Sequence, residues 1–315
     1  MTEKSSRSPH RYLFIGGAGF IGSAIIRQLQ QNEGSPSITV LEPPHADISR
    51  LMGCNVRLVR GTLHDTELID RLITDNGVGT VIHLVSTMIP CSTYEDYLTE
   101  LFTVARPSIR LMELCAKRDV RLVYFSSGGA VYGESEDRKP FKESDKLNPI
   151  SYYGLSKLLI EANIRFEHRV NGLKYLILRP SNPYGPGQYT DGRQGLIATA
   201  LSKIQAGQPV TVWGDGSAVR DYIYIDDLAK AACAIMRSCA ENESINIGSG
   251  EGLTVKDVLG FINDVVTEPM TVQYGKERKG DVNHSVLDVT RMQQICQMRF
   301  TAMREGIRQL IVHNS

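Results

Sequence analysis

A tyrosine and a lysine stand four residues apart in the segment SYYGLSK, residues 151–157. On a helix, Tyr153 and Lys157 lie on the same face. A free tyrosine has a pKa of about 10 and is a poor base at neutral pH, but nearby positive charges favour its phenolate. Lowering that pKa to about 7 requires roughly 4 kcal/mol. We therefore predict that Tyr153 acts as a general base on a hydroxyl group, with Lys157 as its partner.

A glycine-rich turn lies near the N-terminus, between a predicted strand and a predicted helix. Residues 17–22, GAGFIG, fit the pattern G-x-G-x-x-G, and another glycine precedes them. Such glycines permit a tight turn and let backbone N–H groups approach a pyrophosphate at the positive end of a helix. Glu42 ends the next predicted strand, where a carboxylate accepts hydrogen bonds from ribose hydroxyls and repels a 2′-phosphate. We predict an NAD site, rather than an NADP site, that includes Gly16, Gly19, Phe20, Ile21, Gly22 and Glu42.

A second glycine-rich segment, SSGGAVYG at residues 126–133, leaves the fifth predicted strand at its carboxyl end. Open parallel sheets bind their ligands at that edge. The segment therefore brings hydroxyl groups toward the predicted site of Tyr153. There Tyr153 can take a proton from a substrate hydroxyl while a nicotinamide takes hydride from the same carbon.

Together with RPSNPYGPG at 179–187 and RDYI at 220–223, these motifs resemble the extended short-chain dehydrogenase/reductase family. Within it, the chain looks most like the NAD-dependent nucleotide-sugar epimerase/dehydratase group of the UDP-glucose 4-epimerase type. The resemblance covers nearly the whole chain, from about residue 11 to about residue 310. It implies an NAD cofactor, a nucleotide-sugar substrate and a homodimer formed through the predicted helices 94–116 and 151–170.

The resemblance also implies roles for individual residues. Tyr153 is the expected base, and Lys157 is expected to hold the nicotinamide ribose and lower the tyrosine pKa. Leu63 is expected to contact the adenine through its backbone. A bidentate guanidinium suits a diphosphate and a carboxylate suits a ribose diol. The implied substrate contacts are Ser127, Tyr153, Asn182, Arg193, Arg220, Arg278 and Asp281, with Gln194 as a further candidate beside Arg193.

Three positions depart from the family pattern. A serine or threonine normally stands three residues before the valine of V-Y-G, and here that residue is Gly128. Ser127 can replace it only if the backbone has already turned, because adjacent residues of an extended chain point to opposite sides. The family usually has an asparagine near the position of Thr103. Thr62 stands where the family usually has an aspartate that contacts the adenine.

The residues around the second glycine-rich segment bear on the reaction. Gly129 and Ala130 stand where a 4,6-dehydratase needs acids, and Glu42 disfavours an NADPH-dependent reductase. Epimerisation at C4 of a UDP-sugar is therefore the favoured reaction. We expect Gly128 and Gly129 to make room for the sugar to turn, so a bulky residue at 128 should slow epimerisation more than it weakens binding. A nucleotide-sugar reductase or dehydrogenase, and a non-catalytic dinucleotide sensor, remain as alternatives.

Alternating apolar strands and helices must position these residues. Short apolar runs at 12–15, 38–41, 56–59, 80–84, 122–125 and 175–178 predict parallel strands buried on both faces. Helices are predicted at 21–30, around 68–73, at 94–116 and at 151–170. The fold class is therefore α/β, a Rossmann-type doubly wound parallel sheet over residues 11–178.

The sequence changes texture after residue 179, where proline and glycine crowd into a loop. Helices are predicted at 196–206, 226–238, 254–266 and 290–298, with strands at 210–213 and 245–247. We assign residues 179–315 to a smaller C-terminal α/β lobe that binds the sugar nucleotide, and some segments of it may return to the main sheet. Residues 1–10 read as a disordered tail.

Composition agrees with a soluble enzyme. Lys+Arg and Asp+Glu each number 35, giving a formal net charge of zero, which disfavours nucleic-acid or membrane-surface binding. No apolar run approaches the ~20 residues of a membrane span. The six cysteines show no metal-binding spacing, so no metal is expected, and they are typical of reduced thiols in a cytoplasmic protein.

Overall fold

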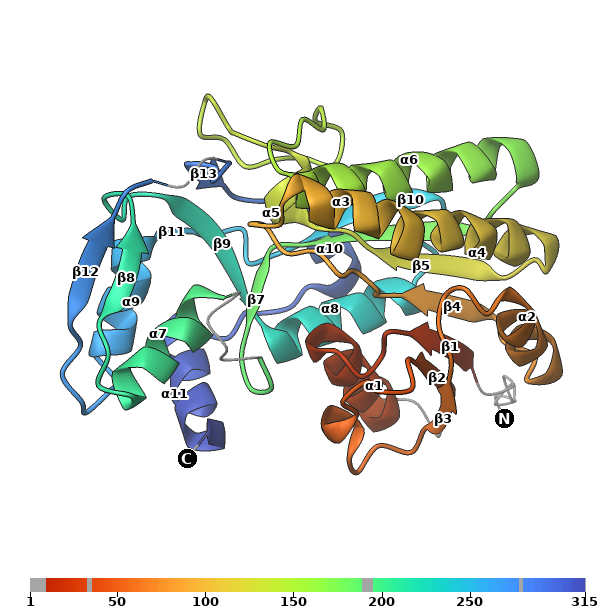
Figure 1. Cartoon of the computed structure of the whole chain (residues 1–315), viewed down its shortest axis with the longest axis horizontal. Helices are drawn as coiled ribbons and strands as arrows, with labels where there is room; N and C mark the ends of the chain where they lie inside the picture. The colour runs from red at the N-terminus through yellow and green to blue at the C-terminus, as the bar shows by residue number, and fades with distance from the viewer. Residues whose placement is uncertain (1–9, 33–35, 189–194, 278–279, 315) are drawn as a thin grey trace, which may run out of the picture.

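Seven parallel strands form the central sheet in the order β10-β6-β5-β4-β1-β2-β3 (Figure 1). The structure is a computed structural model that describes residues 10–32, 36–188, 195–277 and 280–314. The predicted tail, residues 1–10, thus lies almost wholly outside the described residues. The strands are β1 (Arg11–Ile15), β2 (Ser37–Glu42), β3 (Arg57–Arg60), β4 (Thr80–His83), β5 (Arg121–Phe125), β6 (Tyr175–Pro180) and β10 (Glu243–Ile247). The predicted doubly wound sheet is confirmed, with each predicted strand found within about two residues of its expected bounds.

Helices cover both faces of this sheet because alternate strand residues point to opposite sides. In β1, Tyr12 and Phe14 pack in the cluster that contains α1 (Phe20–Asn32) and α8 (Ile225–Arg237). Leu13 and Ile15 pack in the cluster on the other face. That face is covered by α2 (Thr66–Asp75), α4 (Arg106–Lys117) and α6 (Tyr152–Asn171).

The long helical stretch predicted at 94–116 is confirmed, and it contains a π-helical turn that was not predicted. It consists of α3 (Tyr94–Glu100), a π-helical turn η2 (Leu101–Ala105) and α4. Pro107 lies in the first turn of α4 and offers no N–H to the carbonyl of Thr103 four residues earlier. A proline in that place clashes with the same carbonyl, so the helix widens before it continues. Pro107 was therefore the feature of the sequence that could have predicted the π turn, which the spacing of apolar residues does not indicate.

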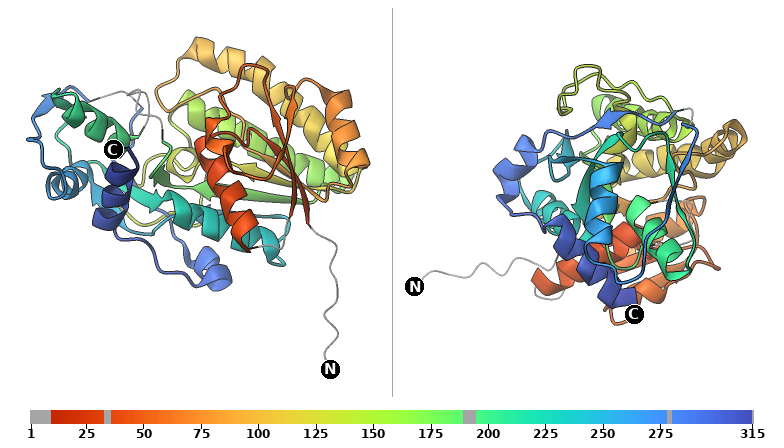
Figure 2. Two further views of the ribbon diagram at one scale, coloured as in Figure 1. Left: turned by 90° about the horizontal axis from the view of Figure 1, so that it is seen from below. Right: turned by 90° about the vertical axis from the view of Figure 1, so that its left-hand side faces the viewer.

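The small lobe lies beside the sheet (Figure 2). It holds α7 (Leu196–Gln205), α9 (Val255–Asn263) and α11 (Met303–Asn314), with the paired strands β8 (Val210–Trp213) and β12 (Val272–Gly275). A second small sheet is built on β9 (Val219–Tyr224), which pairs with β7 (Asn182–Tyr184), β11 (Gly252–Thr254) and β13 (His284–Ser285). The sequence patterns did not predict helix α11 or the strands β7, β9, β11, β12 and β13. Apolar and polar residues do not alternate clearly along these strands, and most of the strands are short.

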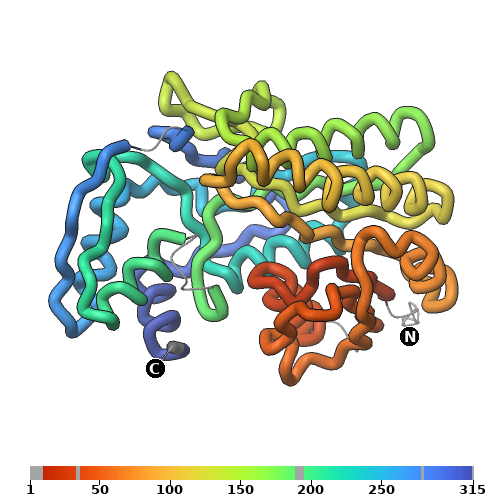
Figure 3. The backbone as a smooth tube through the Cα atoms, in the orientation of Figure 1, coloured from red at the N-terminus to blue at the C-terminus, as the bar shows by residue number. Residues whose placement is uncertain are grey.

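The chain returns to the large lobe after residue 179. Helix α8 packs against α1, β10 pairs with β6, and α10 (Thr290–Cys296) lies against both α8 and β10. The cyan part of the backbone trace follows this return (Figure 3). Residues from both halves of the sequence therefore line the carboxyl edge of the main sheet. Among the described residues, no helix combines the length and apolar character that crossing a bilayer requires.

Candidate active site

Tyr153 and Lys157 lie in the first two turns of α6, on one face as predicted. The Ser151 hydroxyl caps the helix by accepting a hydrogen bond from the Gly154 N–H at 3.1 Å. Lys157 is buried, and its Nζ donates to the Phe125 carbonyl at 3.1 Å, at the end of β5. The same Nζ lies 5.7 Å from the centroid of the Tyr153 ring. The ammonium is thus fixed between α6 and the central sheet.

Ser127 joins this pair. The short helix α5 (Gly128–Val131) begins directly after it, while Ser127 itself keeps an extended backbone with φ of −152°. Ser126 is therefore turned into the core, and Ser127 lies close enough to Tyr153 for its hydroxyl to lower the pKa of the phenol. The structure thus brings together Ser127, Tyr153 and Lys157, the three residues predicted to be catalytic.

The two glycines of this segment have different surroundings. A Cβ on Gly128 would lie 2.6 Å from a methyl group of Leu287 and 3.0 Å from the Arg179 carbonyl oxygen. Gly128 therefore faces packed core, and the expectation that it makes room for the sugar was wrong. A Cβ on Gly129 would meet only the Asn182 amide, at 3.7 Å. Gly129 is the glycine with space beside it.

Burial dominates the electrostatics of the pair. It raises the pKa of Tyr153, the hydrogen bond from Ser127 opposes that rise, and the charge of Glu100 adds to it. Burial also lowers the pKa of Lys157 to about 8, against the opposing charges of Glu100 and Glu161. The expected depression of the tyrosine pKa by Lys157 is therefore not seen in the protein alone. A positive group added beside Tyr153 is still needed to favour its phenolate.

The glycine-rich turn has the geometry that a dinucleotide requires. Gly16 adopts a positive φ of 84°, and a Cβ on Gly22 would lie 2.6 Å from the Gly17 carbonyl oxygen, so only glycine lets helix and turn meet this closely. Phe20 and Ile21 begin α1, and Gly19 is exposed beside them. The N–H groups at this helix end can receive a pyrophosphate.

Glu42 ends β2 beside the same turn. Its buried carboxylate accepts a hydrogen bond from the Ala18 N–H at 2.6 Å. Burial raises the pKa of Glu42, while the Ala18 N–H and the charge of Arg60 lower it. Leu63 packs its side chain in the core, which leaves its backbone groups for a ligand. Thr62, at the position where the family usually has an aspartate, donates hydrogen bonds from its N–H and its hydroxyl to the Asp65 carboxylate. The acid at the end of β2 fits NAD, and the nearby Arg60 is engaged with the Pro43 and Ala46 carbonyls at 3.0 and 3.2 Å.

Comparisons with known proteins agree with this geometry. Residues 12–248 match the model of the NAD dependent epimerase/dehydratase family. The chain belongs to this family. It is 30% identical to a dTDP-4-dehydro-6-deoxyglucose reductase of Escherichia coli, over 95% of this chain and 96% of that protein. It is also 30% identical to a UDP-glucose 4-epimerase of Azospirillum brasilense, over 93% and 88% of the two chains.

A solved structure is similar throughout. The UDP-glucose 4-epimerase of Thermotoga maritima, determined with UDP-glucose, superimposes with a TM-score of 0.89 at 30% identity, covering 96% of this chain and 98% of that one. The protein is thus an extended short-chain dehydrogenase/reductase of the nucleotide-sugar epimerase/dehydratase family, and NAD is its cofactor.

The substrate residues implied by the family resemblance are partly placed. Asn182 starts β7, donates to the Asp221 carbonyl at 2.8 Å and lies beside Gly129. Arg220 lies on β9, half-buried; burial lowers the pKa of its guanidinium, while Tyr222, Asp281 and Glu134 oppose this. Asp281 is exposed near Arg220. Arg193, Gln194 and Arg278 lie outside the described residues.

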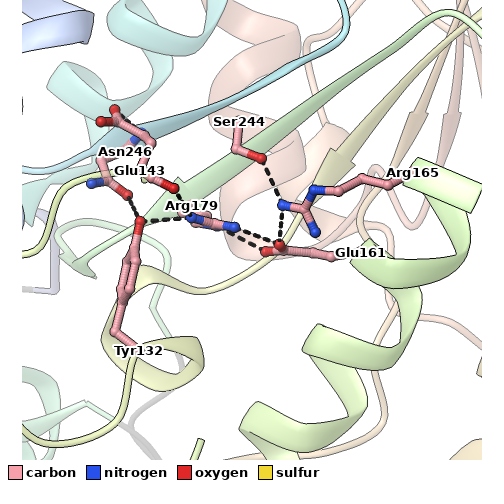
Figure 4. Close-up of polar contacts among 7 residues, drawn as sticks. All are labelled: Tyr132, Glu143, Glu161, Arg165, Arg179, Ser244 and Asn246. Atoms are coloured by element: carbon pink, nitrogen blue, oxygen red, sulfur yellow. Dashed lines mark hydrogen bonds and ion pairs between the residues drawn. The ribbon is translucent and has the colours of Figure 1, made fainter. Parts of the chain in front are cut away.

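A buried polar network joins α6 to the central sheet (Figure 4). Arg179, at the end of β6, donates through Nε and Nη2 to the two oxygens of Glu161 on α6 at 3.0 and 2.6 Å. It also donates to the Tyr132 hydroxyl at 2.7 Å, which in turn donates to Asn246 on β10 at 2.7 Å. The network thus joins α6 to β6, to β10 and to the residue that follows α5.

Sequence reasoning missed two acids of this region. Glu161 and Glu100 are almost fully buried, at 0% and 1% exposed. Both occur among apolar residues of a predicted helix. An acid on the apolar face of a helix could have indicated a buried carboxylate at each position. Glu161 is explained by its pairing with Arg179, whereas Glu100 has only hydroxyl and backbone donors among the described residues.

Proposed function

We propose that this protein epimerises C4 of a UDP-sugar through a transient 4-keto intermediate, with Tyr153 as the base. The observation that supports this most directly is the meeting of Ser127, Tyr153 and Lys157 at the carboxyl edge of the sheet. The neighbouring Gly129 and Ala130 supply no acid for dehydration. Such a site can move a proton on and off one hydroxyl oxygen and little else.

In this proposal the 4-hydroxyl of the sugar lies between Ser127 and Tyr153. The phenolate of Tyr153 takes its proton as the C4–H bond breaks, and the Ser127 hydroxyl holds the oxygen. A bound NAD would supply the acceptor for the hydride that leaves C4 and the donor for its return to the opposite face of the ketone. Tyr153 then gives the proton back to the oxygen, so the protein ends in its starting protonation state.

Lys157 has two parts to play in the proposed reaction. Its Nζ is tethered to the Phe125 carbonyl and keeps further N–H groups for a cofactor ribose hydroxyl. Its charge also stabilises the phenolate that forms next to it. A rate gain of about 10²–10⁴ is the usual contribution of one positioned acid–base group.

The sugar requires space to turn between its two bound orientations. Gly129 provides that space in this proposal, because the side of the residue where a Cβ would stand meets only the Asn182 amide. Arg220 binds the diphosphate, and Asp281, which lies near it, accepts from the nucleoside ribose. Arg193 and Arg278 are proposed to complete the nucleotide site.

A reductase is the second candidate function, because one of the similar proteins is a dTDP-4-dehydro-6-deoxyglucose reductase. The same catalytic residues can protonate a ketone oxygen in a net reduction. The position of Glu42 at the end of β2 favours NAD and argues against the NADPH that most reductases consume. The intact Tyr153 and Lys157 argue against a sensor without turnover.

We also propose a homodimer formed through α3, the π turn and α6, which lie side by side (Figure 1). Tyr94, Leu98 and Phe102 are exposed along one helix, and Tyr152, Leu155 and Phe166 along the other. A second copy would cover both rows at once.

The product is proposed to serve polysaccharide synthesis in the cytoplasm.

One experiment separates the candidates. The protein is incubated with UDP-glucose, UDP-N-acetylglucosamine or UDP-glucuronate without added reductant, and the products are resolved by NMR. An epimerase yields the C4 epimer while the bound cofactor shows no net change. Consumption of added NADH or NADPH with a 4-keto sugar, and no epimer, supports the reductase instead. No product from any nucleotide sugar supports the sensor.

A further inference from the structure

Tyr124 is a buried tyrosine of β5 whose ring faces the Lys157 ammonium. Its side chain is 0% exposed, and Lys157 Nζ lies 5.2 Å from the centroid of its ring, closer than the 5.7 Å to the Tyr153 ring. The same Nζ donates to the carbonyl of Phe125, the next residue of β5, at 3.1 Å. A cation within about 6 Å of a ring face is attracted to it, most strongly where water is excluded. The Lys157 charge therefore has two aromatic rings and one carbonyl oxygen as close neighbours.

The position of the Tyr124 ring is fixed by His83, its direct partner on β4 in the parallel register. The two ring centroids are 5.4 Å apart at an interplanar angle of 66°, an edge-to-face contact. The Val85 N–H donates to His83 Nδ1 at 3.2 Å, which leaves the ring proton on Nε2, 2.7 Å from the Ser108 hydroxyl. Burial, with the charge of Lys157, lowers the pKa of His83 to about 3. His83 thus supports the ring as a neutral group and adds no second cation.

The hydroxyl of Tyr124 differs from its ring. The oxygen is buried and makes no hydrogen bond to any residue that the structure describes. A buried hydroxyl without a partner does not stabilise its surroundings. Burial, with the charge of Glu161, raises the pKa of this phenol well above its usual value, so it stays protonated near neutral pH. The face of the ring, rather than the hydroxyl, is what Tyr124 offers to Lys157.

We propose that Tyr124 is a positioning residue of the catalytic site, whose ring face holds the Lys157 ammonium charged and in place for the nicotinamide ribose and for Tyr153. The charges of Glu100 on α3 and Glu161 on α6 also favour the ammonium, against the burial of Lys157. Tyr124 acts through Lys157 and needs no contact with the cofactor or the sugar. The inference rests on the proposed role of Lys157 in binding NAD and in catalysis.

The test compares Tyr124→Leu, which removes the ring, with Tyr124→Phe, which keeps the ring face and removes only the hydroxyl. The ionisation of Lys157 is followed by NMR of isotope-labelled lysine, and its signal is assigned by its loss in Lys157→Met. With leucine, the titration midpoint should fall by about one pH unit, roughly a tenfold change in the equilibrium between ammonium and amine. With phenylalanine, the midpoint should stay at the wild-type value. A midpoint that is unmoved or higher with leucine, or that falls equally with phenylalanine, overturns the proposal.

NAD affinity gives a second readout, measured by calorimetry without sugar. Tyr124→Leu should raise the Kd for NAD by roughly fivefold or more, whether or not UDP-sugars are the substrates. If Tyr124→Leu does not fold by circular dichroism, Tyr124→Met takes its place.

Tyr175→Leu is the matched control for the loss of a core aromatic residue. Tyr175 is a buried tyrosine of the adjacent strand β6, and it also makes an edge contact with a histidine, His168, at a centroid distance of 5.4 Å. Its replacement should destabilise the protein without changing the Lys157 midpoint or the Kd for NAD. Equal losses of NAD affinity in Tyr124→Leu and Tyr175→Leu would mean that Tyr124 only fills the core, which overturns the proposal.

Discussion

The three side chains of the proposed catalytic site owe their places to two local causes. Tyr153 and Lys157 share a face because α6 begins at a serine cap two residues before Tyr153. Ser127 reaches the phenol because the chain turns into α5 immediately after it. The helical spacing of the pair was readable from the sequence. The direction in which the Ser127 side chain points was not readable from the sequence, because it depends on the residue at which the extended backbone ends and α5 begins.

Replacing Tyr153 by phenylalanine should reduce kcat by about 10³-fold, because the base is lost. Binding of NAD and of UDP, measured by calorimetry, should change little, since the ring is kept. Tyr152→Phe is the control; it alters the neighbouring tyrosine, whose ring stacks on Tyr97 at a 5.6 Å centroid distance on the exposed side of α6. Comparable loss in both variants would remove Tyr153 from the mechanism.

At the scale of elements, the short helix α5 and the helical stretch α3–η2–α4 pack around the proposed catalytic site. The strands of the main sheet were predictable because continuous apolar runs require burial on both faces. The π turn was not predicted, since apolar spacing alone passes over the clash between Pro107 and the Thr103 carbonyl. The short strands of the small lobe pair across distant segments, which no local pattern records. The buried Arg179–Glu161 pair is also a product of tertiary packing.

The two glycines of α5 should respond differently to alanine. Gly128→Ala should destabilise the protein by about 1–3 kcal/mol, because the added methyl overlaps Leu287 in packed core. Gly129→Ala should leave stability nearly unchanged and reduce kcat, since its methyl enters the space beside Asn182. Urea unfolding and steady-state kinetics measure the two effects. The reverse pattern would mean that Gly128, not Gly129, borders the sugar.

At the scale of the whole molecule, the two lobes share the chain. Helix α8 and strand β10 bring residues after 179 back to the main sheet, so the small lobe is anchored to the large one by more than one crossing. Asn182, which is proposed to bind the substrate, therefore lies beside Gly129, close to the segment that carries Ser127. The exposed rows on α3, the π turn and α6 lie on the large lobe, away from α11 (Figure 1).

Phe102→Glu should convert the proposed dimer to a monomer, because Phe102 is 65% exposed in the single chain and a charge there would be buried by the partner. Light scattering after size exclusion gives the mass directly. Val312→Glu, at a 77% exposed position on α11, should leave the mass unchanged. A wild-type protein that runs as a monomer at all concentrations contradicts this assembly.

The central claim is that hydride leaves and returns to the same carbon of a UDP-sugar while Tyr153 handles the proton. The most direct measurement uses UDP-glucose that carries deuterium at C4, incubated with the protein without external reductant and followed by proton and deuterium NMR. We predict UDP-galactose that retains deuterium at C4, with no product when Tyr153 is phenylalanine. Exchange of the C4 label with solvent, or epimer formation by the Tyr153→Phe variant at the wild-type rate, would contradict the account.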